Sequence, residues 1–262
     1  MSSNLTGPTI GVAQGLWIAS ATQNHRLGER TNTADGRAYR YCSVEPSATT
    51  VTGQVAGASL VAGNVIQAPA PVANHLARTG IAAAINDLVI SAVLGATAAY
   101  VNQYAEGFVQ VDTTPGNGIV YQISSHALVA SSGTLTANLG QDDKVLVALT
   151  TSSTVGFHYN PYKAVIQGPV TTLTSGAVGV AHWALPSLTT GGATGQNYGW
   201  LQTRGPCPVL INGTPDVGRM VAWTAATAAG TVSITSSTFQ PIGWMMQTGV
   251  DTKNNLVYLT ID

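Results

Sequence analysis

Charge is what this sequence has least of. Only 8% of its 262 residues are Asp, Glu, Lys or Arg, whereas 45% are hydrophobic, and an ordinary soluble domain has about 25% charged residues. The formal net charge is −1 and the pI is close to 6.5. Proteins that gain affinity by neutralising phosphates are distinctly basic. The composition therefore argues against nucleic acid as a partner.

Cysteine and long apolar runs are scarce as well. Cys42 and Cys207 are far apart and belong to no metal-binding or redox motif, so we expect two free thiols in a reducing compartment. A disulfide between them stays an alternative at this stage. No run of about 18 apolar residues occurs, and the N-terminal MSSNLTGPTIGVAQ lacks the pattern of a cleaved signal peptide. We expect no membrane span and no export by such a signal.

Catalytic motifs are missing too. The sequence contains no G-x-S-x-G elbow, phosphate-binding loop, H-E-x-x-H helix or dinucleotide fingerprint. The five histidines are scattered without metal-ligand spacing, and Asp142-Asp143, the only acidic pair, follows Gly140 as a turn would. We expect no enzyme, no cofactor and no metal. A hydrolase with a carboxylate pair drawn from distant parts of the chain stays a rival hypothesis.

What the sequence does contain is the pattern of strands and turns. Short stretches rich in Val, Ile, Thr and Tyr alternate with Gly, Pro, Asn and Asp. The expected strands are 119–124, 144–150, 199–203, 209–212, 219–224, 230–235 and 256–261. Residues 88–93 are expected as a strand rather than as part of an Ala-rich helix, and 97–106 as a short helical turn. The fold class is mainly β, with antiparallel β-sandwich or barrel-like domains.

We expect three parts along the chain. Residues 1–45 form an extended N-terminal arm that ends in a strand after the Asp35-Gly36 turn. Residues 46–165 form a β-rich domain, and residues 166–262 form a second one. Pro161 and Gly168-Pro169 mark the boundary between the two domains.

Four of the five tryptophans lie in the C-terminal part of the chain, at positions 183, 200, 223 and 244. Three of them, Trp200, Trp223 and Trp244, lie among aliphatic neighbours in strand-like segments, which favours packing in a core or an interface. The alternative is a stacking platform for sugars, as in a carbohydrate-binding tail or adhesin module.

Several segments together resemble a family of head proteins from tailed phages, the capsid decoration or cement proteins. They include a Gly-Trp-Leu-Gln-Thr-x-Gly block and are spread over most of the chain: Asp35–Tyr41, Val72–His75, Tyr104–Val111, Gly116–Ile123, Asn160–Tyr162, Val178–Val180, Tyr198–Pro206, Val217–Arg219 and Ile242–Gly243. The resemblance implies a non-enzymatic β-rich protein on the outer surface of an icosahedral head. It also implies a homotrimer that holds the major capsid protein in place, made in the host cytoplasm and located in the virion.

The few charges are unevenly placed, because four of the ten basic residues lie between residues 25 and 42. Strand alternation after Gly36 puts Arg37, Tyr39 and Tyr41 on one face and Arg40 on the other. Arg and Tyr are favoured at recognition surfaces. Our hypothesis is that six residues contact acidic groups of the capsid or of a neighbouring subunit: Arg26, Arg30, Arg37, Tyr39, Arg40 and Tyr41. The alternative is a solvated basic loop neutralised by Glu29 and Asp35.

Overall fold

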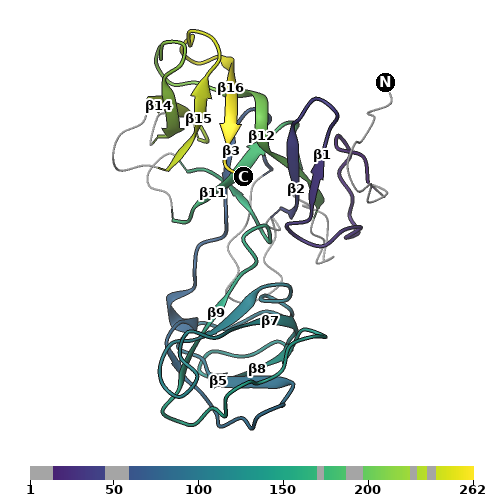
Figure 1. Cartoon of the computed structure of the whole chain (residues 1–262), viewed down its shortest axis with the longest axis vertical. Coiled ribbons are helices and arrows are strands. Elements are labelled where there is room, and N and C mark those ends of the chain that lie inside the picture. The colour runs from purple at the N-terminus through teal and green to yellow at the C-terminus, as the bar shows by residue number, and fades with distance from the viewer. Residues whose placement is uncertain (1–13, 45–58, 170–173, 187–196, 225–228, 235–239) are drawn as a thin grey trace. The chain divides into compact units, whose positions relative to one another are not determined.

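The computed structural model describes residues 14–44, 59–169, 174–186, 197–224, 229–234 and 240–262. These residues form sixteen strands and one 3-10 turn, η1 (Ala73–His75) (Figure 1). The strands pair as antiparallel sheets, which confirms the mainly β fold class. Among these residues, no helix has the length and apolar character needed to span a membrane.

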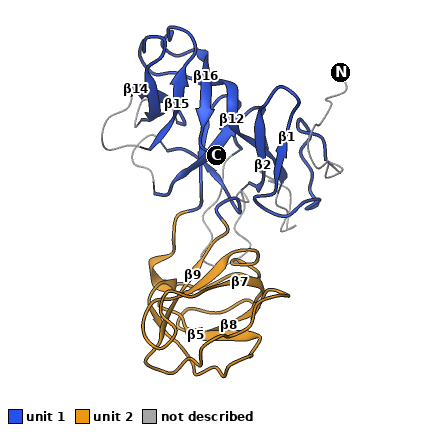
Figure 2. Ribbon diagram, viewed as in Figure 1, with its two compact units in different colours: residues 1–48, 56–69, 161–262 blue, residues 49–55, 70–160 orange. Residues whose placement is uncertain are grey.

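The chain divides into two compact units (Figure 2). Unit 1 consists of residues 1–48, 56–69 and 161–262, and unit 2 consists of residues 49–55 and 70–160. This division differs from the contiguous domains 46–165 and 166–262 expected from the sequence. The reason is strand pairing: β3, which precedes residues 70–160 of unit 2, pairs with β10 and β11, which follow them.

Unit 2 is a six-stranded, nearly closed barrel in the order β4-β9-β6-β7-β8-β5. Its strands are β4 (Arg78–Thr79), β5 (Val89–Val93), β6 (Phe108–Val111), β7 (Val120–Ser125), β8 (Thr134–Leu139) and β9 (Thr154–His158). A bridge between Gly80 and Ala92 joins the two ends of the sheet. Along β8 exposed and buried residues alternate strictly, so one face fills the barrel and the other faces water.

Unit 1 is a ten-stranded sheet that forms half of a barrel. Its strands are β1 (Arg30–Asn32), β2 (Ala38–Ser43), β3 (Val65–Gln67), β10 (Ile166–Gln167), β11 (Ala177–Ala181), β12 (Tyr198–Leu210), β13 (Met220–Trp223), β14 (Val232–Ile234), β15 (Pro241–Met245) and β16 (Asn254–Thr260). The 13-residue β12 organises the sheet, because its first half pairs with β2 and β11 and its second half with β16. The expected arm is therefore partly built into the sheet: β1 and β2 belong to it, while residues 1–13 and 45 lie outside the described residues.

Most expected strands are found, including β5, which was distinguished from a helix by its β-branched residues. Residues 144–150 are an exception. They form a bend at residues 146–147 and an isolated bridge between Leu149 and Ala83. Val145 and Leu149 are buried while Leu146 and Val147 are exposed, so the buried positions are four residues apart rather than two. Residues 101–106 form turns in which Asn102 and Glu106 adopt positive φ, whereas residues 97–100 hold a bend and an isolated bridge between Ala99 and Val129.

Candidate functional site

The basic segment lies on and around the β1–β2 hairpin of unit 1. Antiparallel pairing places Arg30 opposite Arg40 and Thr31 opposite Tyr39. The connecting turn contains Gly36 at φ +85°, a left-handed conformation that glycine adopts without a steric penalty. The expected Asp35-Gly36 turn is thus confirmed.

Arg37 is paired within this turn. Its Nε donates to Oδ2 of Asp35 at 2.8 Å, and the hydroxyl of Thr33 donates to Oδ1 of the same carboxylate. The hydrogen bond from Thr33, followed by the interactions with Arg37, lowers the pKa of Asp35. Both partners are partly exposed, so the ion pair contributes at most about 1 kcal/mol. For Arg37, the geometry corresponds to the neutralised-loop alternative.

Arg30 and Arg40 share one carboxylate, that of Asp262. Arg40 binds it in bidentate fashion, with Nε 2.9 Å from Oδ2 and Nη2 2.8 Å from Oδ1, while Nε of Arg30 lies 3.4 Å from Oδ2. Nη1 of Arg40 donates to the carbonyl of Gly28 at 2.7 Å. Two like charges on directly opposed strand residues would repel, and Asp262 offsets that repulsion. The hydrogen bonds from Arg40 are the main cause of the lowered pKa of Asp262.

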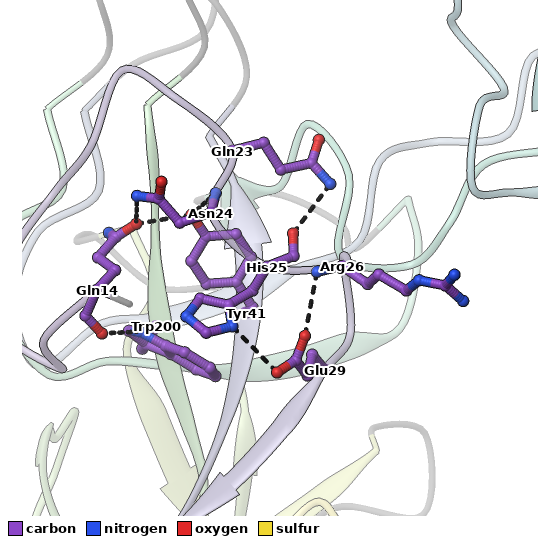
Figure 3. A network of polar contacts seen from close by, with 8 residues as sticks. All are labelled: Gln14, Gln23, Asn24, His25, Arg26, Glu29, Tyr41 and Trp200. Atoms are coloured by element: carbon purple, nitrogen blue, oxygen red, sulfur yellow. Dashed lines mark hydrogen bonds and ion pairs between the residues drawn. The ribbon is translucent and has the colours of Figure 1, made fainter. Parts of the chain in front are cut away.

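A network of hydrogen bonds connects the basic segment to Gln14 and to the buried Trp200 (Figure 3). The Tyr41 hydroxyl donates to Oε1 of Gln14 at 2.7 Å and accepts from the backbone N–H of Asn24 at 3.1 Å. Nε1 of Trp200 donates to the carbonyl of Gln14 at 3.2 Å. Nδ1 of His25 lies 3.0 Å from Oε1 of Glu29, whose other oxygen accepts from the N–H of Arg26.

Tyr39 and Tyr41 are core residues. They are 1% and 0% exposed and pack in one cluster with Leu16, Leu27 and Trp200. Burial raises the pKa of Tyr39 and of Tyr41 to about 12, so both phenols are neutral at physiological pH. Their side chains therefore do not belong to the outer surface, although both were grouped with the arginines on sequence grounds.

Arg26 differs from the other three arginines. It is exposed, its guanidinium points away from the network in Figure 3, and it forms no ion pair with any described residue. Arg30 has 39% of its side chain exposed and makes the longer contact to Asp262. Of the four arginines in the basic segment, Arg26 and Arg30 are thus the two that a partner can reach most readily.

Asp262 was not predicted from the sequence. It is 222 positions from Arg40, and no local pattern links the two residues. Gln14 and Trp200 were likewise not associated with the basic segment, since their contacts arise from the pairing of β2 with β12. These contacts depend on the pairing of strands that are far apart in the sequence.

The two thiols are free and buried, as expected. Burial raises the pKa of Cys42 and of Cys207 to about 12. Sγ of Cys207 lies 3.9 Å from Nδ1 of His182, and burial lowers the pKa of that imidazole. Both members of the pair are neutral, so the contact lacks the thiolate that a nucleophile or metal ligand requires.

Unit 2 contains a buried polar cluster that the sequence did not reveal. Nε2 of His75 lies 2.9 Å from the carbonyl of Thr97, and Nδ1 lies 2.5 Å from the Tyr104 hydroxyl. Nε2 of Gln103 donates to the same hydroxyl at 3.1 Å. The carbonyl requires a proton on Nε2, so the neutral ring accepts at Nδ1 from Tyr104. Burial lowers the pKa of His75. Among the described residues, this cluster included, no three His, Cys, Asp or Glu side chains are grouped so that they could hold a metal ion.

The exposure of the tryptophans distinguishes core packing from a stacking platform for sugars. Trp200 and Trp223 are 1% and 0% exposed, which confirms core packing for these two residues. Trp244 is 39% exposed and stacks on Tyr258, with ring centroids 5.2 Å apart. A sugar platform that includes Trp200 and Trp223 is inconsistent with their burial.

Comparison of the chain with protein-family models, with curated proteins and with solved structures found no match.

Proposed function

We propose that this chain is a non-enzymatic structural protein of a tailed-phage virion, a decoration protein that binds the outer surface of the capsid and stabilises it. Its partners are the major capsid protein and further copies of itself, as a homotrimer; neither nucleic acid nor a membrane is required. The proposal rests on the resemblance of the sequence segments described above and on the character of the protein surface.

The observation that carries the proposal is the number of exposed large apolar side chains. Among its described residues, unit 2 exposes eleven of them to at least a third of their area, and the sequence of the unit holds only seven charged residues. Scattered exposed apolar residues are ordinary, but so many on a small charge-poor barrel are typical of a surface that other proteins cover. A cement protein needs such contact areas, because buried unpaired charges are costly at an interface.

The chemistry of the described residues fits a structural role. The two buried thiols are protonated, the phenols of the basic segment are neutral, and most of its charged groups are paired. The polar groups around β1 and β2 hold the hairpin against the core.

Within the basic segment, Arg26 and Arg30 are the residues we assign to the capsid contact. Both are exposed, and neither contributes to the core. An acidic group of the shell can pair with Arg26 directly and can share Arg30 with Asp262. Arg37 and Arg40 position the hairpin through Asp35 and Asp262.

The test uses particles made from the genome that encodes this chain, with the gene for the chain deleted. Purified protein added to these particles should cosediment with them. The Arg26→Glu/Arg30→Glu variant should bind at least about tenfold more weakly, because like charges then face each other at the contact. Lys253→Glu changes an exposed cation outside the segment and should bind like the wild type. If the wild-type protein stays in the supernatant at micromolar concentration, the proposed function is wrong.

A further inference from the structure

One face of the unit 1 sheet carries an apolar row across four strands. Met220 of β13 lies opposite Trp244 of β15, Trp244 opposite Tyr258 of β16, and Tyr258 opposite Pro206 of β12. Directly opposed residues of antiparallel strands have Cβ atoms about 4.5–5.5 Å apart and point to the same face. The four side chains therefore form a continuous strip, which we call the aromatic row. Three of its strands, β12, β15 and β16, are labelled in Figure 1.

The aromatic row is accessible, and two of its rings stack on each other. Met220 is 53% exposed and Trp244 39% exposed, and Tyr258 and Pro206 are partly exposed. The rings of Trp244 and Tyr258 stack at an interplanar angle of 13°. Rings that are already held in place lose little conformational entropy on binding. Aromatic residues and Met are also the types enriched in interfaces.

Two arginines are close to the row along the chain. Arg219 immediately precedes Met220, and Arg204 lies two residues before Pro206, opposite Thr260. Both arginines are exposed, and neither takes part in an ion pair within the described part of the chain. A surface with an apolar centre and a cationic rim fits a partner with an apolar centre and an acidic rim.

Unit 2 has a surface of that kind. Ile85, Leu88 and Leu146 are 57%, 64% and 59% exposed. The segments that carry them are adjacent: the N–H of Asn86 donates to the carbonyl of Val145 at 2.8 Å, and the N–H of Val145 donates to that of Asp87 at 2.9 Å. We call Ile85, Leu88, Leu146 and the acidic residues beside them the acidic patch.

The acidic residues of the patch are Asp87, Asp142 and Asp143. Asp87 lies between Ile85 and Leu88 in the sequence, and the other two belong to the turn after Leu139, whose N–H donates to the carbonyl of Leu88 at 2.9 Å. Lys144 is the one cation in this part of the sequence.

The net charges of the two units also have opposite signs. Unit 2 holds two basic and five acidic residues, a net charge of −3, whereas unit 1 holds eight basic and six acidic residues, a net charge of +2. In a chain with so few charges, this asymmetry favours contact between unlike units.

We infer that the aromatic row of one copy binds the acidic patch of a second copy. Such a contact is heterologous, since each copy contributes a different surface, and it closes into a ring when the rotation between copies permits. The inference rests on the self-association within the proposed function but does not depend on binding to a shell.

Two variants separate the two surfaces. Met220→Gln/Trp244→Gln removes the two most exposed side chains of the row, and Leu88→Gln/Leu146→Gln removes two of the three apolar side chains of the patch. Each variant should weaken self-association by about 30-fold or more, the effect of losing well-packed anchors at an interface. When the two variants are mixed, each still has one intact surface, so they should form mixed dimers and no larger species. Analytical ultracentrifugation with one variant fluorescently labelled measures both results.

Val250→Gln and Leu128→Gln serve as matched controls, because these side chains are 55% and 61% exposed outside the two surfaces. Both controls should associate like the wild type, and circular dichroism should show all variants to be folded. A wild-type monomer at 100 µM, whatever its binding to particles, would overturn the inference and the self-association on which it rests. Folded variants that associate like the wild type, or that fail to form mixed dimers, would overturn the assignment of these surfaces while the trimer and shell binding stand.

Discussion

Asp262→Asn tests how the hairpin of the basic segment is held. The substitution keeps the size of the side chain but removes the charge that Arg30 and Arg40 share at 3.4 and 2.8 Å. Two opposed guanidinium groups then face each other without a counter-charge. Hydrogen bonds to charged groups contribute about 1.5–3 kcal/mol, and partial exposure of all three side chains reduces this. We expect a loss of about 1–2 kcal/mol in the free energy of unfolding.

Thermal unfolding followed by tryptophan fluorescence measures this loss, because all five tryptophans belong to unit 1. For a unit of this size the midpoint should fall by about 3–6 °C. Asp112→Asn, an exposed acid in unit 2 outside the acidic patch, should leave that midpoint unchanged.

The dependence on pH gives a second readout. The pKa of Asp262 is lowered in the folded protein, so its contribution is present above the unfolded pKa of about 3.9 and is lost as pH falls through the folded pKa. The difference between wild type and Asp262→Asn should be constant from pH 5 to 8 and shrink below about pH 4. A midpoint within 1 °C of the wild type at pH 7 would refute the reasoning.

Three further predictions concern the core. Burial lowers the pKa of His75 in the folded protein, so the free energy of unfolding of unit 2 should decrease as pH falls from the unfolded pKa of about 6.5 towards the folded-state pKa. Urea unfolding monitored by near-ultraviolet dichroism of tyrosine should show this dependence of stability on pH. The variant His75→Gln should show a weaker dependence. Gly243→Ala should prevent folding of unit 1, since its Cβ would lie 2.1 Å from the carbonyl oxygen of Tyr258; a soluble variant with a wild-type melting curve would contradict this. Cys42 and Cys207 should resist a thiol reagent at pH 8 in the folded protein and both react in urea, because pKa values of about 12 leave only about one thiol in 10,000 ionised.

The sequence predicts the strands of this protein better than their partners. Alternation and β-branched residues identified β5 and most of β7, β13 and β16, because these signals are local. The expected division into contiguous domains differs from the two units because the pairing of β3 with β10 and β11 joins segments on either side of residues 70–160. No local property of residues 65–67 indicates that partner.

The basic segment shows the same limit at the level of side chains. Its charge and its turn were visible in the sequence, and Asp35 is a neighbour of Arg37 along the chain. The acid that pairs with Arg30 and Arg40 lies at residue 262 and reaches them through the pairing of β12 with both β2 and β16. Alternation also assigned Tyr39 and Tyr41 to a recognition face, whereas β2 is buried on both faces. Burial on the second face depends on parts of the chain far away in sequence.

An electron cryomicroscopy map of intact particles made from the genome that encodes this chain tests the central proposal most directly. We predict density on the outer capsid surface that accommodates the half-barrel and the nearly closed barrel, with Arg26 and Arg30 facing acidic residues of the major capsid protein. A map at side-chain resolution in which the outer surface lacks this chain, or in which the chain occupies the tail, would contradict the account.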